Sequence, residues 1–382
     1  MENSGRRGQL SAPGQLESGA VVLPEAPRIP DQPLGELAAQ HGLKLSGARP
    51  SLPAYLAMLW QRRHFITGYA TARNVSMYTE AKLGQLWQVL TPLLNAGVYY
   101  LIFGVLFEAS RGVQHYPAFL LAGVFVFAFT ERSIVTGSNV MRANLQLIRA
   151  LYFPRAALPL AYVIVELQQM LVGFVVLIPV MLVSGEPPTV YWFLLVPVVL
   201  LQTAFNIGAA LIVARLGGSL ADVSELIPFI LRITRYFCGV MYMVTLLPAA
   251  VPVWGIKLLS LNPPAVYISL TRVALMTTYR QNSPGNQPYS YAYCTAFHNN
   301  TGGYSIPLAG GKYLPLPSHT AVADGYTVIG HHPVVPNAVL QAFCPAVVTN
   351  NDLWLAAVGW GLGFLVLGVI FFWQAESQYG RG

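Results

Sequence analysis

Six stretches of this chain are apolar for about 20 residues each, the length that crosses the hydrocarbon core of a bilayer. They run over residues 86–107, 117–137, 156–183, 190–214, 226–247 and 353–373. Lipid offers no water to hydrogen-bond an open backbone, so such stretches must be helices packed on one another. We therefore expect an all-α integral membrane protein with six transmembrane helices, and a soluble enzyme is excluded.

The placement of charge predicts how the spans are oriented. Only 10% of the residues are charged and the net charge is +7; ordinary globular domains carry about 25% charged residues. Cations gather before the first span and between the second and third, whereas the alternate loops hold Arg111 alone up to residue 190. Positive loops stay in the cytoplasm, so both termini are expected there. The basic balance indicates topology and contact with anionic lipid, not nucleic-acid binding.

Composition divides the chain into five parts. Residues 1–50 are rich in Pro, Gly, Ala and Gln and are predicted to be a disordered cytoplasmic tail. An amphipathic interfacial helix and linker follow over 51–82, and spans one to five with a re-entrant segment occupy 83–279. An extracytoplasmic subdomain is expected over 280–351, and the sixth span with a short cytoplasmic tail over 352–382.

The segment SLPAYLAMLWQRRHFI at 51–66 has the pattern of an amphipathic helix. Ser51 can cap it and Pro53 suits its first turn. Tyr55 and Leu59 fall on one face together with Leu52 and Leu56, which favours a helix lying in the cytoplasmic leaflet. The alternative is a soluble helix packed on the underside of the domain.

Two cytoplasmic connections have helical features. Within 138–155, apolar residues are spaced as in a short amphipathic helix that Pro154 ends. Within 216–228, Gly217 and Gly218 are expected to break the chain, and Ser219 to cap the next turn.

The long outside segment has two parts. Up to residue 279, short apolar runs around Asn262 and two prolines predict re-entrant or interfacial helices. Residues 280–351 predict turns and short strands, such as GYTVIG at 325–330. Cys294 and Cys344 lie in this oxidising compartment, so a disulfide between them is expected. No metal site is expected, and Cys238 is predicted to be a buried apolar residue.

Four motifs carry a resemblance to a known family. They are KLGQLWQVLTPLLNAGVYYLIFGVLF at 82–107, ANLQLIRALYFPRAALPL at 143–160, ELIPFILRI at 225–233 and LNPPAVYISLTRVAL at 261–275. Their order resembles the membrane permease subunit of bacterial polysaccharide ABC exporters, the O-antigen, teichoic-acid and galactan group of the ABC type-2 superfamily. The resemblance covers about residues 52–279 and the last span, and the galactan exporters look most similar. The subdomain at 280–351 and the long N-terminal tail depart from the family pattern.

The resemblance implies a homodimer in the bacterial cytoplasmic membrane that works with two copies of an ATP-binding subunit. The sequence has no G-x-x-x-x-G-K-[ST] phosphate loop, so no cofactor is expected on this chain, and ATP and Mg are expected on the partner. Residues 139–152 and 219–226 would be coupling helices, with contacts to the ATPase from Arg142, Asn144, Leu145, Ile148, Arg149, Tyr152, Asp222 and Glu225. The alternative is that both stretches are ordinary linkers.

Basic residues near the spans are candidate phosphate ligands. Arg62, Arg63 and His64 lie where a lipid diphosphate would arrive, and Arg232 and Arg235 could guide it through the bundle, because arginine matches phosphate oxygens well. Topology alone also places cations there. Glu131, Arg132, Glu166 and the two arginines of span five could instead neutralise one another, which we favour for Glu166.

Aromatic side chains of spans one and five are candidates for contacts with sugars. They are Tyr99, Tyr100, Phe103, Phe107, Tyr236 and Tyr242. Aromatic faces offer apolar contact without a tight site; helix packing is the alternative for each of them.

The predicted protein is a transport subunit that carries out no covalent chemistry. Its expected cargo is a polysaccharide linked to a polyprenyl diphosphate, such as cell-wall galactan. The alternatives are an exporter of teichoic acid, drug or lipid in the same superfamily, or a membrane-embedded glycosyltransferase. A glycosyltransferase would need clustered acidic residues at the membrane face, and these are sparse.

Overall fold

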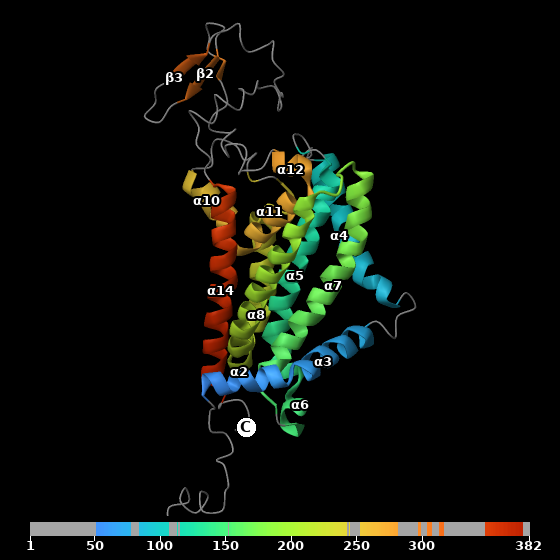
Figure 1. Cartoon of the computed structure of the whole chain (residues 1–382), viewed down its shortest axis with the longest axis vertical. Coiled ribbons are helices and arrows are strands. Elements are labelled where there is room, and N and C mark those ends of the chain that lie inside the picture. Colours follow the sequence, from blue (N-terminus) through green and yellow to red (C-terminus); the bar gives the residue numbers. More distant parts are fainter. Residues whose placement is uncertain are drawn as a thin grey trace, which may run out of the picture. The chain divides into compact units, whose positions relative to one another are not determined.

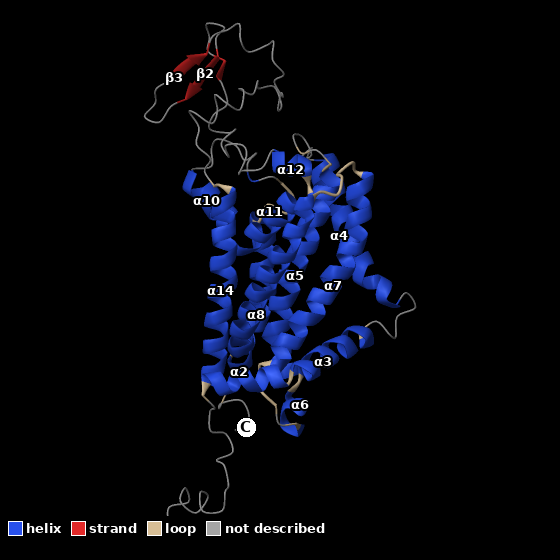
Figure 2. Ribbon diagram, viewed as in Figure 1, coloured by secondary structure: helices blue, strands red, loops and turns tan. Residues whose placement is uncertain are grey.

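A computed structural model describes residues 51–77, 84–106, 113, 115–151, 153–242, 244, 253–281, 297–298, 304–307, 313–316 and 348–376. Helices dominate the bundle, as Figure 2 shows. Among the described residues, five helices are long and apolar enough to cross a membrane. They confirm the all-α membrane class.

The five helices agree with the apolar stretches of the sequence. The first is α4 (Trp87–Tyr99), preceded by a 3₁₀ turn, η1 (Gly84–Leu86), and continued by a π-helix, η2 (Tyr100–Leu106). The others are α5 (Tyr116–Ala143), α7 (Ala157–Val183), α8 (Leu195–Ser219) with its leading turn η3 (Val190–Leu194), and α14 (Asn350–Ala375). Figure 1 shows α5 beside α7 and α8. The side chains of α5 are buried along most of its length, so the core lies around this helix.

The predicted fifth span is shorter than expected. A helix through residue 247 is wrong, because α9 runs over Ala221–Phe237 and the chain then turns at Gly239, whose φ is +65°. A positive φ is available to glycine at little cost. The carbonyl oxygens of Gly239 and Val240 instead accept hydrogen bonds of 2.8 Å each from the buried guanidinium of Arg272. The helix therefore ends where a side chain from another element satisfies its backbone.

The interfacial segment forms two helices instead of one, α2 (Leu52–Gln61) and α3 (Arg63–Ser76). Ser51 takes the N-cap position, but its side chain makes no capping hydrogen bond. Tyr55 and Leu59 are buried, whereas Leu56 and Trp60 stay exposed. Figure 1 shows α2 crossing the ends of the long helices. We call this the α2–α3 end of the bundle.

The connections between spans differ from expectation in their boundaries. A short helix, α6 (Leu145–Ala150), follows a break at Asn144. Gly217 and Gly218 do not break the chain, because α8 continues through both to Ser219. Ser219 donates its hydroxyl back to the carbonyl of Arg215 instead of capping α9. A Cβ at Gly217 would lie 2.1 Å from the carbonyl oxygen of Ser138, so this glycine permits close packing of α8 on α5.

Three short helices follow α9 along the chain, where short helices were predicted. These are α10 (Val253–Leu261), α11 (Pro263–Leu275) and α12 (Thr277–Gln281). Asn262 caps α11 through a hydrogen bond from the Ala265 amide, and α11 is buried along nearly its whole length. Glu186 accepts hydrogen bonds from the amide and hydroxyl of Thr277 at the start of α12.

Three short antiparallel strands are described beyond α12. They are β1 (Phe297–His298), β2 (Tyr304–Pro307) and β3 (Tyr313–Leu316), in the order β1-β2-β3. Short strands were expected in this region. The predicted tail 1–50, the GYTVIG strand, Phe107, Tyr152 and the Cys294–Cys344 pair lie outside the described residues. Cys238 is buried at the end of α9, as expected.

Candidate functional site

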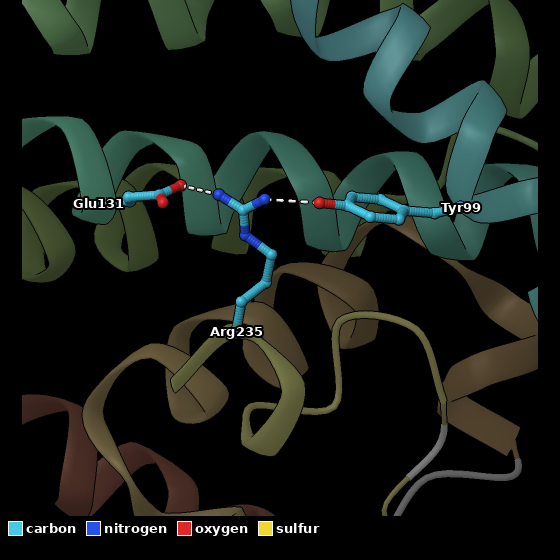
Figure 3. Close-up of polar contacts among 3 residues, drawn as sticks. All are labelled: Tyr99, Glu131 and Arg235. Atoms are coloured by element: carbon cyan, nitrogen blue, oxygen red, sulfur yellow. Dashed lines mark hydrogen bonds and ion pairs between the residues drawn. The ribbon is translucent and has the colours of Figure 1, made fainter. Parts of the chain in front are cut away.

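A charged cluster joins three membrane helices near the middle of α5. Glu131 of α5 forms an ion pair with Arg235 of α9, and Arg235 Nη1 donates a hydrogen bond of 2.5 Å to the Tyr99 hydroxyl of α4 (Figure 3). The Arg235 and Glu131 side chains are 23% and 21% exposed. Pairing lowers the high free energy of an isolated charge inside a membrane. The cluster thus holds α4, α5 and α9 in one arrangement.

A small cavity of about 90 Å³ adjoins this cluster. Its lining includes Asn95, Arg132 and Phe127 besides the three residues of the cluster. The Arg235 guanidinium lies 5.3 Å from the centre of the Phe127 ring, within the range of cation–π attraction. A cation held between a carboxylate, a hydroxyl and an aromatic face can bind an anion by exchanging one of these partners.

The predicted neutralisation of charges is confirmed for one pair. Glu131 and Arg235 pair as described, while Arg132 Nη1 donates a 2.8 Å hydrogen bond to Gln169 Oε1 of α7. Glu166, for which pairing was favoured, is buried in α7, and its Oε2 has no hydrogen-bond partner among the described residues. Arg232 is exposed on α9 and is not among the residues that line the small cavity.

The candidate aromatic residues do not share one environment. Tyr99 belongs to the cluster and Phe103 packs against the core. Tyr100 is exposed, with its ring 6.1 Å from that of Tyr116. Tyr236 is exposed on α9 and Tyr242 is partly buried in the turn after it. Tyr100 and Phe103 fall in the π-helix η2, an uncommon element often found at functional sites.

The basic residues of the interfacial segment lie at the junction of α2 and α3. Arg62, Arg63 and His64 are all exposed. Arg63 Nη1 donates a 3.2 Å hydrogen bond to the carbonyl of Trp60, and its guanidinium lies 5.3 Å from the Trp60 ring. Arg63 lines a different cavity from that of Arg235. The structure therefore separates the two groups of candidate phosphate ligands.

The candidate coupling residues lie at the surface. Arg142, Leu145, Arg149, Asp222 and Glu225 are exposed, and Ile148 is half-buried. Ser224 donates a 3.3 Å hydrogen bond to the carbonyl of Ser138, which joins the start of α9 to α5.

Asn144 has a structural role that its spacing did not indicate. Its Oδ1 accepts a 3.0 Å hydrogen bond from the Tyr69 hydroxyl of α3, and its Nδ2 donates to the carbonyl of Val140 and to the Tyr162 hydroxyl of α7. The break before α6 is thus tied to both the interfacial segment and the third span.

A second polar cluster, not evident from the sequence, lies at the α2–α3 end. The Tyr55 hydroxyl of α2 donates a 2.8 Å hydrogen bond to Glu376, just after α14, and accepts one of 3.2 Å from the Ala156 amide. Arg155 donates to Glu376 from its backbone amide at 3.1 Å and also from its guanidinium. Burial raises the pKa of Glu376, although these hydrogen bonds oppose the rise. The residues of this polar cluster are up to 321 positions apart in the sequence, so no local sequence pattern could indicate the cluster.

Much of the helical bundle lies within a stretch of sequence that matches a known family. Residues 68–276, more than half of the chain, match the ABC-2 type transporter family. The chain belongs to this family.

Curated relatives point in the same direction. This ABC-2 type transporter chain is 27% identical over 172 residues to two O-antigen export system permease proteins of Klebsiella pneumoniae, which covers 45% of this chain and 66% of each relative. It is 26% identical over 226 residues to an O-antigen export system permease protein of Myxococcus xanthus, which covers 58% of this chain and 81% of that relative. The chain thus aligns with just under two thirds of the Klebsiella relatives' length. The predicted family resemblance is confirmed.

Proposed function

We propose that this chain is the permease subunit of an ATP-driven exporter that moves a polyprenyl-diphosphate-linked polysaccharide across the bacterial cytoplasmic membrane. The match to the ABC-2 type transporter family carries this proposal, and the O-antigen export permeases among its relatives favour a polysaccharide cargo. Cell-wall galactan is the first cargo to test, because the sequence motifs resemble those of the galactan exporters. The distribution of arginine supports a cytoplasmic position for both termini.

In this proposal two copies of the chain work with two copies of an ATP-binding subunit, which holds ATP and Mg. The exposed residues of α6 and of the first turn of α9 are the contacts to that subunit. Movement of α6 is passed to α3 and α7 through the hydrogen bonds of Asn144. This chain contributes binding, gating and coupling, without covalent chemistry of its own.

The second copy is proposed to pack on the faces of α4, η2 and α9. Exposed apolar side chains on these elements include Val98 of α4, Leu101 and Val105 of η2, and Phe229 and Ile233 of α9. Coverage of the same faces by lipid is the alternative, and cross-linking between copies distinguishes the two.

The role proposed for the charged cluster follows from its composition. A diphosphate carries more negative charge than one carboxylate and forms forked hydrogen bonds with guanidinium. It would therefore compete with Glu131 for Arg235 and release the contact between α5 and α9. Passing anions would then loosen the cluster that holds α4, α5 and α9 together.

Transport in inverted membrane vesicles tests the proposal. Vesicles containing the full chain and its ATP-binding subunit should move the lipid-linked glycan into the lumen when ATP is supplied, and vesicles lacking either subunit should not. Competition with teichoic-acid, drug or phospholipid cargo separates the alternatives within the superfamily. Transfer of sugar from a nucleotide donor by the purified chain alone would instead establish a glycosyltransferase.

A further inference from the structure

A large apolar cavity of about 650 Å³ lies between the interfacial helices and the bundle. We call it the interfacial groove. Leu56 and Arg63 come from α2 and α3, Leu160 and Ile164 from α7, and Val366 and Val369 from α14. Its volume falls within the range of about 300–1,000 Å³ that is usual for small-molecule sites. None of the helices that line the interfacial groove contributes a residue to the charged cluster of Glu131, Arg235 and Tyr99.

The depth of the interfacial groove corresponds to one leaflet. On α14 its lining runs from Leu365 to Phe372, and the helix ends at Ala375. At 1.5 Å per residue, Leu365 lies about 15 Å from that end, which is half of a hydrocarbon core of about 30 Å. On α7 the lining residues belong to the first two turns. The groove therefore lies beside the acyl chains of the leaflet at the α2–α3 end.

The rim of the groove is cationic. Arg63 lines it, and Trp60 positions the guanidinium by the hydrogen bond and ring contact described above. Arg62 and His64 flank Arg63, and the segment 52–76 contains no acidic residue. Arginine near a membrane surface attracts anionic headgroups, and tryptophan prefers the headgroup level. An apolar groove with a cation at its rim is complementary to a lipid phosphate with an attached chain.

We propose that the interfacial groove binds one anionic phospholipid of the surrounding leaflet, with its phosphate on Arg63 and an acyl chain along Ile164 and Val369. The lipid fills the space under α2 and holds the interfacial helices against α7 and α14. The bound molecule is a resident lipid and not the cargo, because the groove is built from α2, α3, α7, α8 and α14, whereas the charged cluster lies among α4, α5 and α9. The inference does not depend on which cargo is exported.

Native mass spectrometry of the full-length chain tests the proposal, after reconstitution in nanodiscs of phosphatidylglycerol and phosphatidylcholine in equal amounts. The expected result is one phosphatidylglycerol retained per chain after transfer to detergent. Val366→Trp, which fills the groove from the exposed surface of α14, should abolish retention. Arg63→Ala should weaken it about fivefold, the factor that corresponds to about 1 kcal/mol per arginine near a membrane.

Matched variants separate the groove from general effects. Leu367→Trp adds the same ring at the neighbouring exposed position of α14, outside the lining, and Arg73→Ala removes the same charge from α3. Both should retain the lipid as the unchanged chain does. Equal retention by all four variants, equal retention of phosphatidylcholine, or recovery of a polyprenyl diphosphate in the groove would each overturn the proposal.

Discussion

At the scale of single residues, the contact between Arg235 and Glu131 gives a direct prediction. Arg235→Ala leaves the Glu131 carboxylate half-buried without its cation, so it should destabilise the chain more than Arg235→Ala combined with Glu131→Ala. A double-mutant cycle on thermal unfolding in detergent should give a coupling free energy of about 0.5–3 kcal/mol. The exposed Arg232→Ala on the same helix is the control. Additive effects of the two alanine substitutions would show that the pair does not stabilise the bundle.

Glu186 gives a prediction for pH dependence. Burial alone would raise the pKa of this carboxyl, but hydrogen bonds from Thr277 and Thr278 lower it below its ordinary value of 4.5. The stabilisation is therefore present above pH 4.5 and is lost as the pH falls through the lowered pKa. Glu186→Gln should lower the free energy of unfolding at pH 7 by about 1.5–3 kcal/mol. The difference in unfolding temperature between the unchanged chain and Glu186→Gln should disappear on acidification.

Glu225→Gln removes one exposed carboxylate from α9 and should change the unfolding temperature little at any pH. A gap for Glu186→Gln that stays constant down to pH 3 would show that the carboxylate does not hold the start of α12.

Contacts between single residues were predictable from the sequence only where an unpaired charge inside the membrane would be costly. Five charged residues in or near the apolar stretches indicated mutual neutralisation, and two of them, Glu131 and Arg235, form an ion pair. The clusters around Glu376 and Arg272 were not predictable, because each joins segments distant in the sequence. Tyr55 was assigned to the apolar face of its helix and is buried, but its hydroxyl partner lies 321 positions away and could not be predicted.

At the scale of elements, the crossing of α8 and α14 depends on two glycines. A Cβ at Gly208 would lie 2.1 Å from the carbonyl oxygen of Phe364, and one at Gly368 would lie 2.3 Å from the carbonyl oxygen of Gly208. Gly368→Val should force the helices apart and destabilise the chain by about 1–3 kcal/mol. Gly363→Ala on the same helix meets no atom within 4 Å and is the control. The measurement is unfolding in detergent; equal stability of both variants would contradict close packing.

The elements themselves were largely predictable from apolar length. Five stretches became membrane-spanning helices because about 20 apolar residues in lipid have no alternative to a helix. The error at α9 arose because hydropathy does not detect a turn at Gly239 that Arg272 stabilises from a distant element. The division of the interfacial segment at Arg62 was also missed, since amphipathic spacing continues across the break.

At the scale of the whole molecule, the proposed dimer can be tested by cross-linking. Single cysteines in place of Val98 on α4 or Phe229 on α9, in a chain whose native cysteines are replaced, should form disulfide-linked dimers in membranes. Leu355 on α14 is also exposed, and a cysteine in its place should give monomers. Dimers through Leu355 alone would move the interface to the opposite elements.

The proposed coupling to an ATPase has its own test. Arg149→Glu reverses a charge on exposed α6 and should reduce co-purification of the ATP-binding subunit at least fivefold, because rim charges steer association. Arg73→Glu makes the same change on α3, outside the proposed contact, and should leave co-purification unchanged. Equal recovery of the ATPase with both variants would remove α6 from the interface.

The hydrogen bond between Tyr55 and Glu376 also orders the events of biosynthesis. Helix α2 leaves the ribosome before any membrane span, but its carboxylate partner is translated only after the last span. The hydrogen bond between Tyr55 and Glu376 therefore cannot form until α14 has been inserted. Stable packing of α2 on the bundle is therefore a late step of assembly. A chain interrupted before Glu376 would lack the hydrogen bond that holds α2, and this helix would be more accessible to quality-control proteases.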